Sequence, residues 1–315
     1  MCGIVGYLGN RVAQDALIDG LRRLEYRGYD SAGAAFHDGN SFSLVRETGR
    51  VENLAATLRQ NNPTSTLGIA HTRWATHGAV TVSNTHPHLS HDGKIALVHN
   101  GVIENYGPLK RILEGKGIEF SSETDSEVLS NLIAYHYARL GGEEDRFTQA
   151  LREALSQCRG AYGIAVLCVD EPGFLLGARR GSPLVVGLGD GETFLASDAS
   201  AFVGRVRDAV YLKDGEIVLL REDGFRIITM QGEDAKAVSQ PIDQTVEDVE
   251  MGDFDSFMEK EIFEQPVALE NTLRGRFGED GTTAKLGGLE GHEDELRRLD
   301  RIVFVACGTA RHSCM

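Results

Sequence analysis

Two blocks of short, β-rich segments stand on either side of a pair of adjacent helices, and this order constrains the fold more than any other feature. The first block opens with the apolar run MCGIVGYLG and an amphipathic helix over residues 11–28, and it continues with strands over residues 31–39, 41–49, 67–78 and 94–105. The second block, from residue 161 to about 230, consists of short apolar runs separated by Gly and Asp turns. This order differs from a regular strand-helix alternation. It predicts an α+β fold, an α/β/β/α sandwich of two antiparallel sheets between helical layers, and disfavours a doubly wound nucleotide-binding fold.

The two central helices carry signals that indicate where they begin and which face is buried. Thr124 followed by Glu127 forms a capping box, which predicts the start of a helix that continues over residues 127–140. The next helix, over residues 145–158, has its apolar side chains on one face: Phe147, Leu151, Ala154, Leu155 and Cys158. We therefore expect the two helices to lie side by side.

The sequence changes character after about Gly232. An acidic stretch, QTVEDVEMGDFDSF, precedes a predicted helix around residues 258–277, a glycine-rich loop, and a final predicted helix and strand. We expect one domain over residues 2–240, a linker and interdomain helix over 241–292, and the start of another domain over 293–315. The last predicted strand has nothing after it to pair with or cover it, so we expect this second domain to be incomplete.

Charge and cysteine content exclude several classes of protein. The 32 basic and 47 acidic residues give a net charge of −15, which argues against a nucleic-acid partner. The five cysteines are scattered and include no CxxC pair, so they indicate neither a disulfide framework nor a zinc knuckle and favour a reducing cytoplasm. No basic segment precedes the first apolar run, and no apolar stretch approaches the ~18 residues of a membrane-spanning helix. We expect a cytoplasmic protein that acts on small molecules, without a membrane partner.

Cys2 stands directly behind the initiator methionine and is followed by a glycine and an apolar run. Removal of Met1 would leave one residue with both a thiol and a free α-amine, whose ordinary pKa values are about 8.5 and about 7.7–8.0. Such a residue combines a nucleophile with a nearly neutral base. The alternative is that Cys2 is a small buried residue at the start of a strand, because free cysteines are often buried.

Six of the ten histidines lie between His71 and His99. The closest trio, His86, His88 and His91, raises the question of a metal site. No cysteine or carboxylate lies at a matching spacing, and two histidines two residues apart on a strand share a face without supplying a third ligand. We expect no metal and interpret these histidines as hydrogen-bonding groups or as ligands of an organic substrate. We also expect no cofactor, because the chain lacks the GxxxxGK[ST] and strand-GxGxxG-helix patterns.

Three further polar sites could take part in chemistry. Arg73, on a predicted loop, is suited to bind a substrate carboxylate through two hydrogen bonds. Asn100 and Gly101 offer a side-chain amide and a backbone N–H, the two donors that an oxyanion hole requires. Asp125 lies in the first turn of a helix, where the helix dipole favours any acid. The structural alternatives are a solvated arginine next to Trp74 in the core, an ordinary Asn-Gly turn, and a helix-start charge.

Seven motifs occur in the order MCGIVGYLG, LEYRGYDSAG, AHTRWATHG, HPH, VHNGVIEN, SETDSE and RGAYG. Together they resemble the motifs of the class II glutamine amidotransferases, a branch of the N-terminal nucleophile hydrolases. The resemblance covers essentially the whole chain. The segments MEKEIFEQP and VACGTA resemble segments of those members that also have a sugar isomerase domain. It implies a four-layer αββα sandwich that hydrolyses glutamine to glutamate and ammonia. This glutaminase domain would be followed by a linker and the first strand of an incomplete α/β sugar isomerase domain.

The resemblance also implies roles for particular residues. Cys2 would be the nucleophile and its freed α-amine the base, while Asn100 and the Gly101 amide would form the oxyanion hole. The other implied roles are binding of the glutamine α-carboxylate and α-amine by Arg73 and Asp125, further substrate contacts from Thr76, His77 and His86, a gate on the ammonia path at Trp74, and positioning of the terminus by Arg27.

For members with an isomerase domain, the resemblance implies transfer of ammonia to fructose 6-phosphate, giving glucosamine 6-phosphate, in a longer homodimeric enzyme. The segment 307–309 resembles the first phosphosugar loop of that domain, so we expect glutaminase chemistry alone from these residues. Two alternatives stay open: the glutaminase domain of another class II amidotransferase, such as an amidophosphoribosyltransferase or an asparagine synthetase, and an inactive glutamine-binding module. VACGTA argues against the first alternative, and the intact Cys2, Asn100 and Gly101 argue against the second.

Overall fold

The computed structural model describes residues 2–74, 79–142, 145–221, 224–242, 245–246, 252, 254–276, 284, 289, 291–306 and 308–315. The chain divides into two compact units, Met1–Glu250 and Met251–Met315, which we treat separately.

The described part of the first unit contains two sheets, in which all paired strands are antiparallel. The larger sheet has the order β14-β11-β9-β10-β1-β4-β2-β3, and its strands are β1 (Gly3–Gly9), β2 (Ser31–Asp38), β3 (Ser41–Thr48), β4 (Leu67–Arg73), β9 (Val185–Leu188), β10 (Glu192–Ala196), β11 (Asp208–Tyr211) and β14 (Ser239–Pro241). The smaller sheet has the order β13-β12-β8-β7-β6-β5, and its strands are β5 (His88–Leu89), β6 (Ile95–Ile103), β7 (Gly160–Cys168), β8 (Leu175–Arg180), β12 (Glu216–Arg221) and β13 (Gly224–Thr229).

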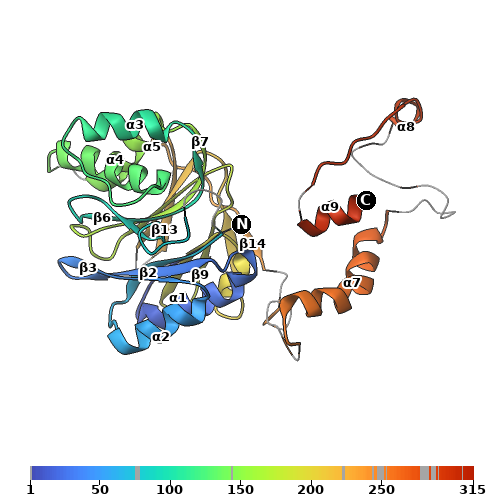
Figure 1. Ribbon diagram of the computed structural model, residues 1–315, viewed down its shortest axis with the longest axis horizontal. Helices are drawn as coiled ribbons and strands as arrows, with labels where there is room; N and C mark the ends of the chain where they lie inside the picture. The colour runs from blue at the N-terminus through green and yellow to red at the C-terminus, as the bar shows by residue number, and fades with distance from the viewer. Residues whose placement is uncertain are drawn as a thin grey trace. The chain divides into compact units, whose positions relative to one another are not determined.

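Helices cover the outer face of each sheet (Figure 1). The larger sheet packs against α1 (Ala13–Leu24) and α2 (Val51–Asn61), and the smaller sheet packs against α3 (Tyr106–Glu114), α4 (Asp125–Arg139) and α5 (Arg146–Gln157). Two short 3-10 helices, η1 (Glu25–Arg27) and η2 (Ala199–Phe202), flank the larger sheet. The four-layer αββα sandwich confirms the fold predicted from the sequence.

Alternation along the strands fills the spaces between these layers. In β1, Val5 and Tyr7 join the apolar cluster that contains α1, whereas Ile4 and Leu8 join the cluster between the two sheets. Because β1 pairs with β10 on one side and with β4 on the other, the beginning of the chain lies in the middle of the larger sheet. Cys2 immediately precedes this central strand.

The start of α4 combines one predicted contact with one that differs from the prediction. The Thr124 side chain caps the helix by accepting from the Glu127 backbone N–H at 3.2 Å, as expected. The buried Glu127 carboxylate, however, accepts from the backbone N–H groups of Ser121 and Ser122, each at 2.7 Å, rather than from the capping residue. These bonds tie the segment before the helix to its first turn, and they hold Asp125 at the helix start.

Three of the described α-helices, α2, α3 and α9 (Gly308–Cys314), are not among those predicted from the sequence. The signal for α2 is nevertheless present, because its buried residues recur at helical spacing: Val51, Leu54, Ala55 and Leu58. The opposite difference occurs at residues 301–306, where the sequence predicts a strand and the structure has none. A strand needs a hydrogen-bonded neighbour, and no residue in the described ranges pairs with this segment.

The second unit contains α7 (Phe257–Leu273), α8 (Glu293–Leu296) and α9 (Gly308–Cys314). The predicted helix around residues 258–277 corresponds to α7. Among the residues of this unit that the structure describes, only Lys260 is buried. No helix in the described part of the chain is long and apolar enough to cross a membrane.

Three buried histidines of the first unit are in ring contact. The His71 and His86 rings lie 4.2 Å apart, and those of His86 and His88 lie 4.7 Å apart. Burial lowers the pKa of His71 to about 3 and the pKa values of His86 and His88 well below their ordinary value. The three imidazoles are therefore uncharged in the folded protein at neutral pH.

We expect the folded state to lose stability as the pH falls below about 6.5, because histidines of the unfolded chain bind protons there and these three do not. Each contributes about 1.4 kcal/mol per pH unit until the pH reaches its folded-state pKa. Urea unfolding at a series of pH values between about 7.5 and about 5 measures the slope. His88→Gln should lower the slope by the contribution of one histidine, about 1.4 kcal/mol per pH unit. Equal slopes for the wild type and His88→Gln would contradict this expectation.

Candidate active site

The Cys2 thiol is held by the backbone of Trp74. The Trp74 N–H donates to Sγ at 3.2 Å, and the thiol lies 3.7 Å from the Trp74 carbonyl oxygen, to which it donates. The pairing of Gly3 with Thr72 places the two segments next to each other. Gly28 allows η1 to end against them, since a Cβ there would lie 2.8 Å from the Trp74 nitrogen.

Burial raises the pKa of the Cys2 thiol above its ordinary value. The hydrogen bond from Trp74 and the charge of Arg73 act in the opposite direction but do not outweigh burial. The thiol is therefore protonated at neutral pH, and a base must take its proton before the sulfur can act as a nucleophile.

Asn100 connects the second sheet to the Cys2 backbone. Its Nδ2 donates to the Cys2 carbonyl oxygen at 3.1 Å, and its Oδ1 lies 3.0 Å from Nε2 of His71. The next residue, Gly101, has a φ of 128°, and a Cβ there would lie 2.1 Å from the Ala161 carbonyl oxygen. Glycine is therefore required at position 101. Cys2 precedes a strand of the larger sheet and the Asn-Gly pair belongs to the smaller sheet, and the two meet through the Asn100–Cys2 hydrogen bond.

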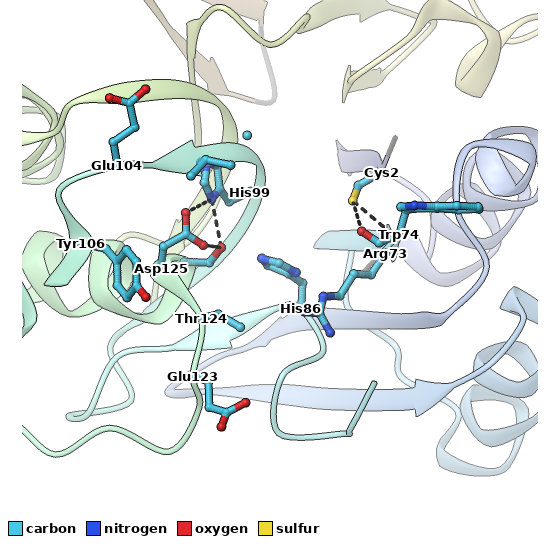
Figure 2. Close-up of a pocket in the computed structure, with 13 residues that line it drawn as sticks. Cys2, Arg73, Trp74, His86, His99, Glu104, Tyr106, Glu123, Thr124 and Asp125 are labelled. Carbon is cyan, nitrogen blue, oxygen red and sulfur yellow. Dashed lines mark hydrogen bonds and ion pairs between the residues drawn. The ribbon is translucent and has the colours of Figure 1, made fainter. Parts of the chain in front are cut away.

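Cys2 opens into a pocket of about 370 Å³ (Figure 2). In the figure, Cys2, Arg73 and Trp74 lie on one side, His99 and Asp125 lie on the other, and His86 projects between them. Six of the residues predicted from the sequence line this pocket: Cys2, Arg73, Trp74, His86, Gly101 and Asp125.

The pocket brings together a cation and a carboxylate. Arg73 is buried, burial lowers its pKa, and one guanidinium nitrogen donates to the Ala79 carbonyl oxygen at 3.2 Å. The Asp125 carboxylate accepts from the Ile103 backbone N–H at 2.7 Å and lies 3.9 Å from Nδ1 of His99. Opposite charges at one pocket match a free amino acid, which carries a carboxylate and an ammonium group.

Of the other predicted residues, Asn100 contacts the Cys2 backbone without lining the pocket, and three lie elsewhere or are not described. Thr76 and His77 fall outside the described residues. Arg27 does not line the pocket but forms a close ion pair with Asp198. His86 is buried at the pocket wall, and neither ring nitrogen has a hydrogen-bond partner in the described part of the chain.

A metal site has no support in the described ranges, where no group of three His, Cys, Asp or Glu side chains could hold an ion. Of the three histidines considered from the sequence, His86 and His88 are buried and in contact, whereas His91 is exposed.

Several pocket residues are missed by reasoning from the sequence: His99, Glu104, Tyr106 and Glu123. Three of them belong to or directly follow HNGVIEN, the segment in which only Asn100 and Gly101 were singled out. Glu123 directly precedes the capping threonine of α4 and exchanges hydrogen bonds with Asn84. His71 is also missed, although it opens the HTRWATHG stretch.

Comparison with known proteins gives consistent matches. Residues 71–204 match a family model described as a glutamine amidotransferase domain. The chain is 47% identical over 313 residues to the glutamine–fructose-6-phosphate aminotransferase (isomerizing) of Thermus thermophilus and 45% identical over 319 residues to that of Chlorobaculum tepidum. Each match covers 99% of this chain, and the chain spans about half the length of these curated relatives.

Two solved structures have the same fold and lower sequence identity. One is the glutamine phosphoribosylpyrophosphate amidotransferase of B. subtilis, with a TM-score of 0.61, and the other is described as the allosteric regulatory enzyme of purine biosynthesis, with a TM-score of 0.62. Each is 26% identical and covers 73% of this chain and 49% of its own. Fold and sequence together show that this chain contains a glutamine amidotransferase domain and is similar to the glutamine–fructose-6-phosphate aminotransferases.

Proposed function

We propose that residues 2–240 hydrolyse glutamine to glutamate and ammonia, with Cys2 as the nucleophile. The observation that carries the proposal is that Cys2, Gly101, Arg73 and Asp125 line one pocket, while Asn100, next to Gly101, donates to the Cys2 carbonyl oxygen. A glutamine molecule with its carboxylate at Arg73 and its ammonium at Asp125 would have its side-chain amide free to reach the thiol.

The proposed reaction uses the α-amine that removal of Met1 would free on Cys2. This amine takes the thiol proton, and the sulfur attacks the side-chain carbonyl carbon of glutamine. The negative oxygen of the tetrahedral intermediate is stabilised by Nδ2 of Asn100 and by the Gly101 N–H. The amine then returns its proton to the leaving nitrogen, ammonia departs, and a thioester remains. Attack of water on the thioester releases glutamate and restores the thiol.

Two other predicted residues, Arg27 and Trp74, have supporting roles in the proposed reaction. Arg27 holds Asp198, whose neighbour Ser197 accepts from the Ile4 backbone N–H at 3.0 Å. Through this chain of contacts Arg27 positions the start of β1.

We also propose Trp74 as a gate for ammonia, because its side chain is 44% exposed and packs edge-on against Tyr29 while its backbone holds the thiol.

We assign the use of the released ammonia to a longer protein. The relatives that share 44–47% identity with this chain are named for fructose 6-phosphate, whereas the phosphoribosylpyrophosphate enzyme is 26% identical. Fructose 6-phosphate is therefore the proposed acceptor, glucosamine 6-phosphate the proposed product, and a homodimer the proposed assembly of that longer enzyme.

A glutamine analogue with an electrophilic carbon in place of its amide should label Cys2. Cys158 and Cys168 should stay unmodified, because burial raises their pKa values to about 12 and about 11. Peptide mapping identifies the labelled residue, excess glutamine should protect it, and Cys2→Ser should abolish the labelling. Modification of Cys158 or Cys168 with Cys2 unmodified would refute the assignment.

Asn100→Ala should lower kcat for glutamine hydrolysis by ~10²–10³ with little change in KM, because an oxyanion donor acts mainly in the transition state. Steady-state kinetics of glutamate release measure both constants. Asn40→Ala, at an exposed turn, serves as the matched control. A rise in KM with unchanged kcat would instead make Asn100 a ground-state binding residue.

Glutamate release by these 315 residues should occur without any sugar phosphate, because the proposed site lies entirely within the first unit. Glutamate and amino sugar are quantified separately, with glutamine alone and with fructose 6-phosphate or phosphoribosyl pyrophosphate added. Glutamate that appears only with phosphoribosyl pyrophosphate would favour the amidophosphoribosyltransferase alternative over the proposed acceptor.

A further inference from the structure

His71 lies behind the proposed oxyanion hole and not in the pocket wall. It belongs to β4 of the larger sheet, is 1% exposed, and reaches across to the smaller sheet, where its Nε2 lies 3.0 Å from Oδ1 of Asn100. Asn100 in turn donates from Nδ2 to the Cys2 carbonyl oxygen at 3.1 Å. The three residues thus form a chain of hydrogen bonds that ends at the backbone of the nucleophile.

The direction of these hydrogen bonds follows from the chemistry of the groups. An amide oxygen can only accept, so the proton of the His71–Asn100 bond must be on Nε2 of the imidazole. Burial keeps the ring neutral at neutral pH, and a neutral imidazole donates from one nitrogen only. His71 is therefore present as the tautomer with its proton on Nε2.

This tautomer fixes which way the Asn100 amide faces. If the amide turned by half a rotation, its NH₂ group would meet the Nε2–H of His71, donor against donor. Its oxygen would meet the Cys2 carbonyl oxygen, acceptor against acceptor. Both hydrogen bonds would be lost, and each would be replaced by a contact between like groups. The observed orientation alone keeps N–H groups on the side of Cys2, where the oxyanion would form.

We propose that His71 is a positioning residue that holds the Asn100 amide in the orientation needed for the oxyanion hole, an inference that rests on the proposed glutamine hydrolysis. It acts through Asn100 and does not touch the substrate. Its effect should therefore fall on kcat, since a misoriented amide fails to stabilise the transition state while Arg73 and Asp125 still bind glutamine.

The competing explanation is structural, because the His71 ring also packs against His86. Two variants separate the explanations. His71→Phe keeps an aromatic ring and removes the donor, whereas His71→Gln loses the ring and retains an N–H group that can reach Asn100. A positioning role predicts that His71→Phe loses activity and that His71→Gln retains it. A packing role predicts the reverse.

The experiment measures glutamate release at neutral pH for the wild type and both variants. We expect His71→Phe to lower kcat by ~10–10² with KM within about twofold, and His71→Gln to recover most of the loss. His37→Phe replaces another buried histidine of the same sheet, one that bonds the Val169 carbonyl oxygen, and should leave kcat unchanged. Thermal unfolding of each variant confirms that it is folded.

A double variant completes the test. If His71 acts through Asn100, then His71→Phe should have little further effect on kcat in the Asn100→Ala background. The proposal would be overturned if the two single-variant losses in kcat multiply in the double variant. An effect of His71→Phe on KM alone, or full activity of that folded variant, would also overturn it. A wild type that releases no glutamate would instead refute the proposed function, so the two failures are distinguishable.

Discussion

The antiparallel pairing of β1 with β4 is the constraint on which the rest of the site depends. It aligns Gly3 with Thr72 and so brings the first residues of the chain next to Arg73 and Trp74, more than seventy positions away. One backbone contact, from the Trp74 N–H to Sγ, then fixes the thiol. Because β1 is a central strand, held on both sides by β10 and β4, this terminus is anchored more firmly than a chain end usually is.

Burial gives the site its chemical character. It keeps the histidines uncharged, and it raises the pKa of the thiol, so the thiol is inert without a nearby base. The same low-polarity surroundings strengthen hydrogen bonds to a developing negative oxygen. The Cys2 thiol is protonated, and the neutral His71 ring donates to the Asn100 amide. This arrangement is consistent with a thiol that reacts only when the α-amine of Cys2 is free to take its proton.

Local pattern was sufficient to predict most of the fold. The apolar run at β1, the cap at Thr124 and the face of α5 each depend on residues close together in the chain, and the structure agrees with all three. The exception at residues 301–306 is instructive. An apolar run predicts a strand, but a strand forms only where a neighbouring segment pairs with it, and the run itself does not determine whether one is present.

Sequence motifs point to only some of the residues that line the pocket, for a related reason. Motifs identified residues that face the pocket, such as Arg73 and Asp125. His71 was not singled out, because its significance comes from a contact with Asn100 on the other sheet, which sequence spacing does not reveal. Glu123 is similar, since its position depends on Asn84, and that pairing is visible only in three dimensions.

The thioester on Cys2 is the one intermediate that the proposed reaction requires, and it can be trapped. The protein is mixed with glutamine, quenched in acid during turnover, and measured by intact mass spectrometry and peptide mapping. We expect a chain without Met1 that carries one glutamyl group, lost on treatment with hydroxylamine and located on the peptide that begins with Cys2. A chain that turns over glutamine with Met1 retained, or with the glutamyl group on another residue, would contradict it.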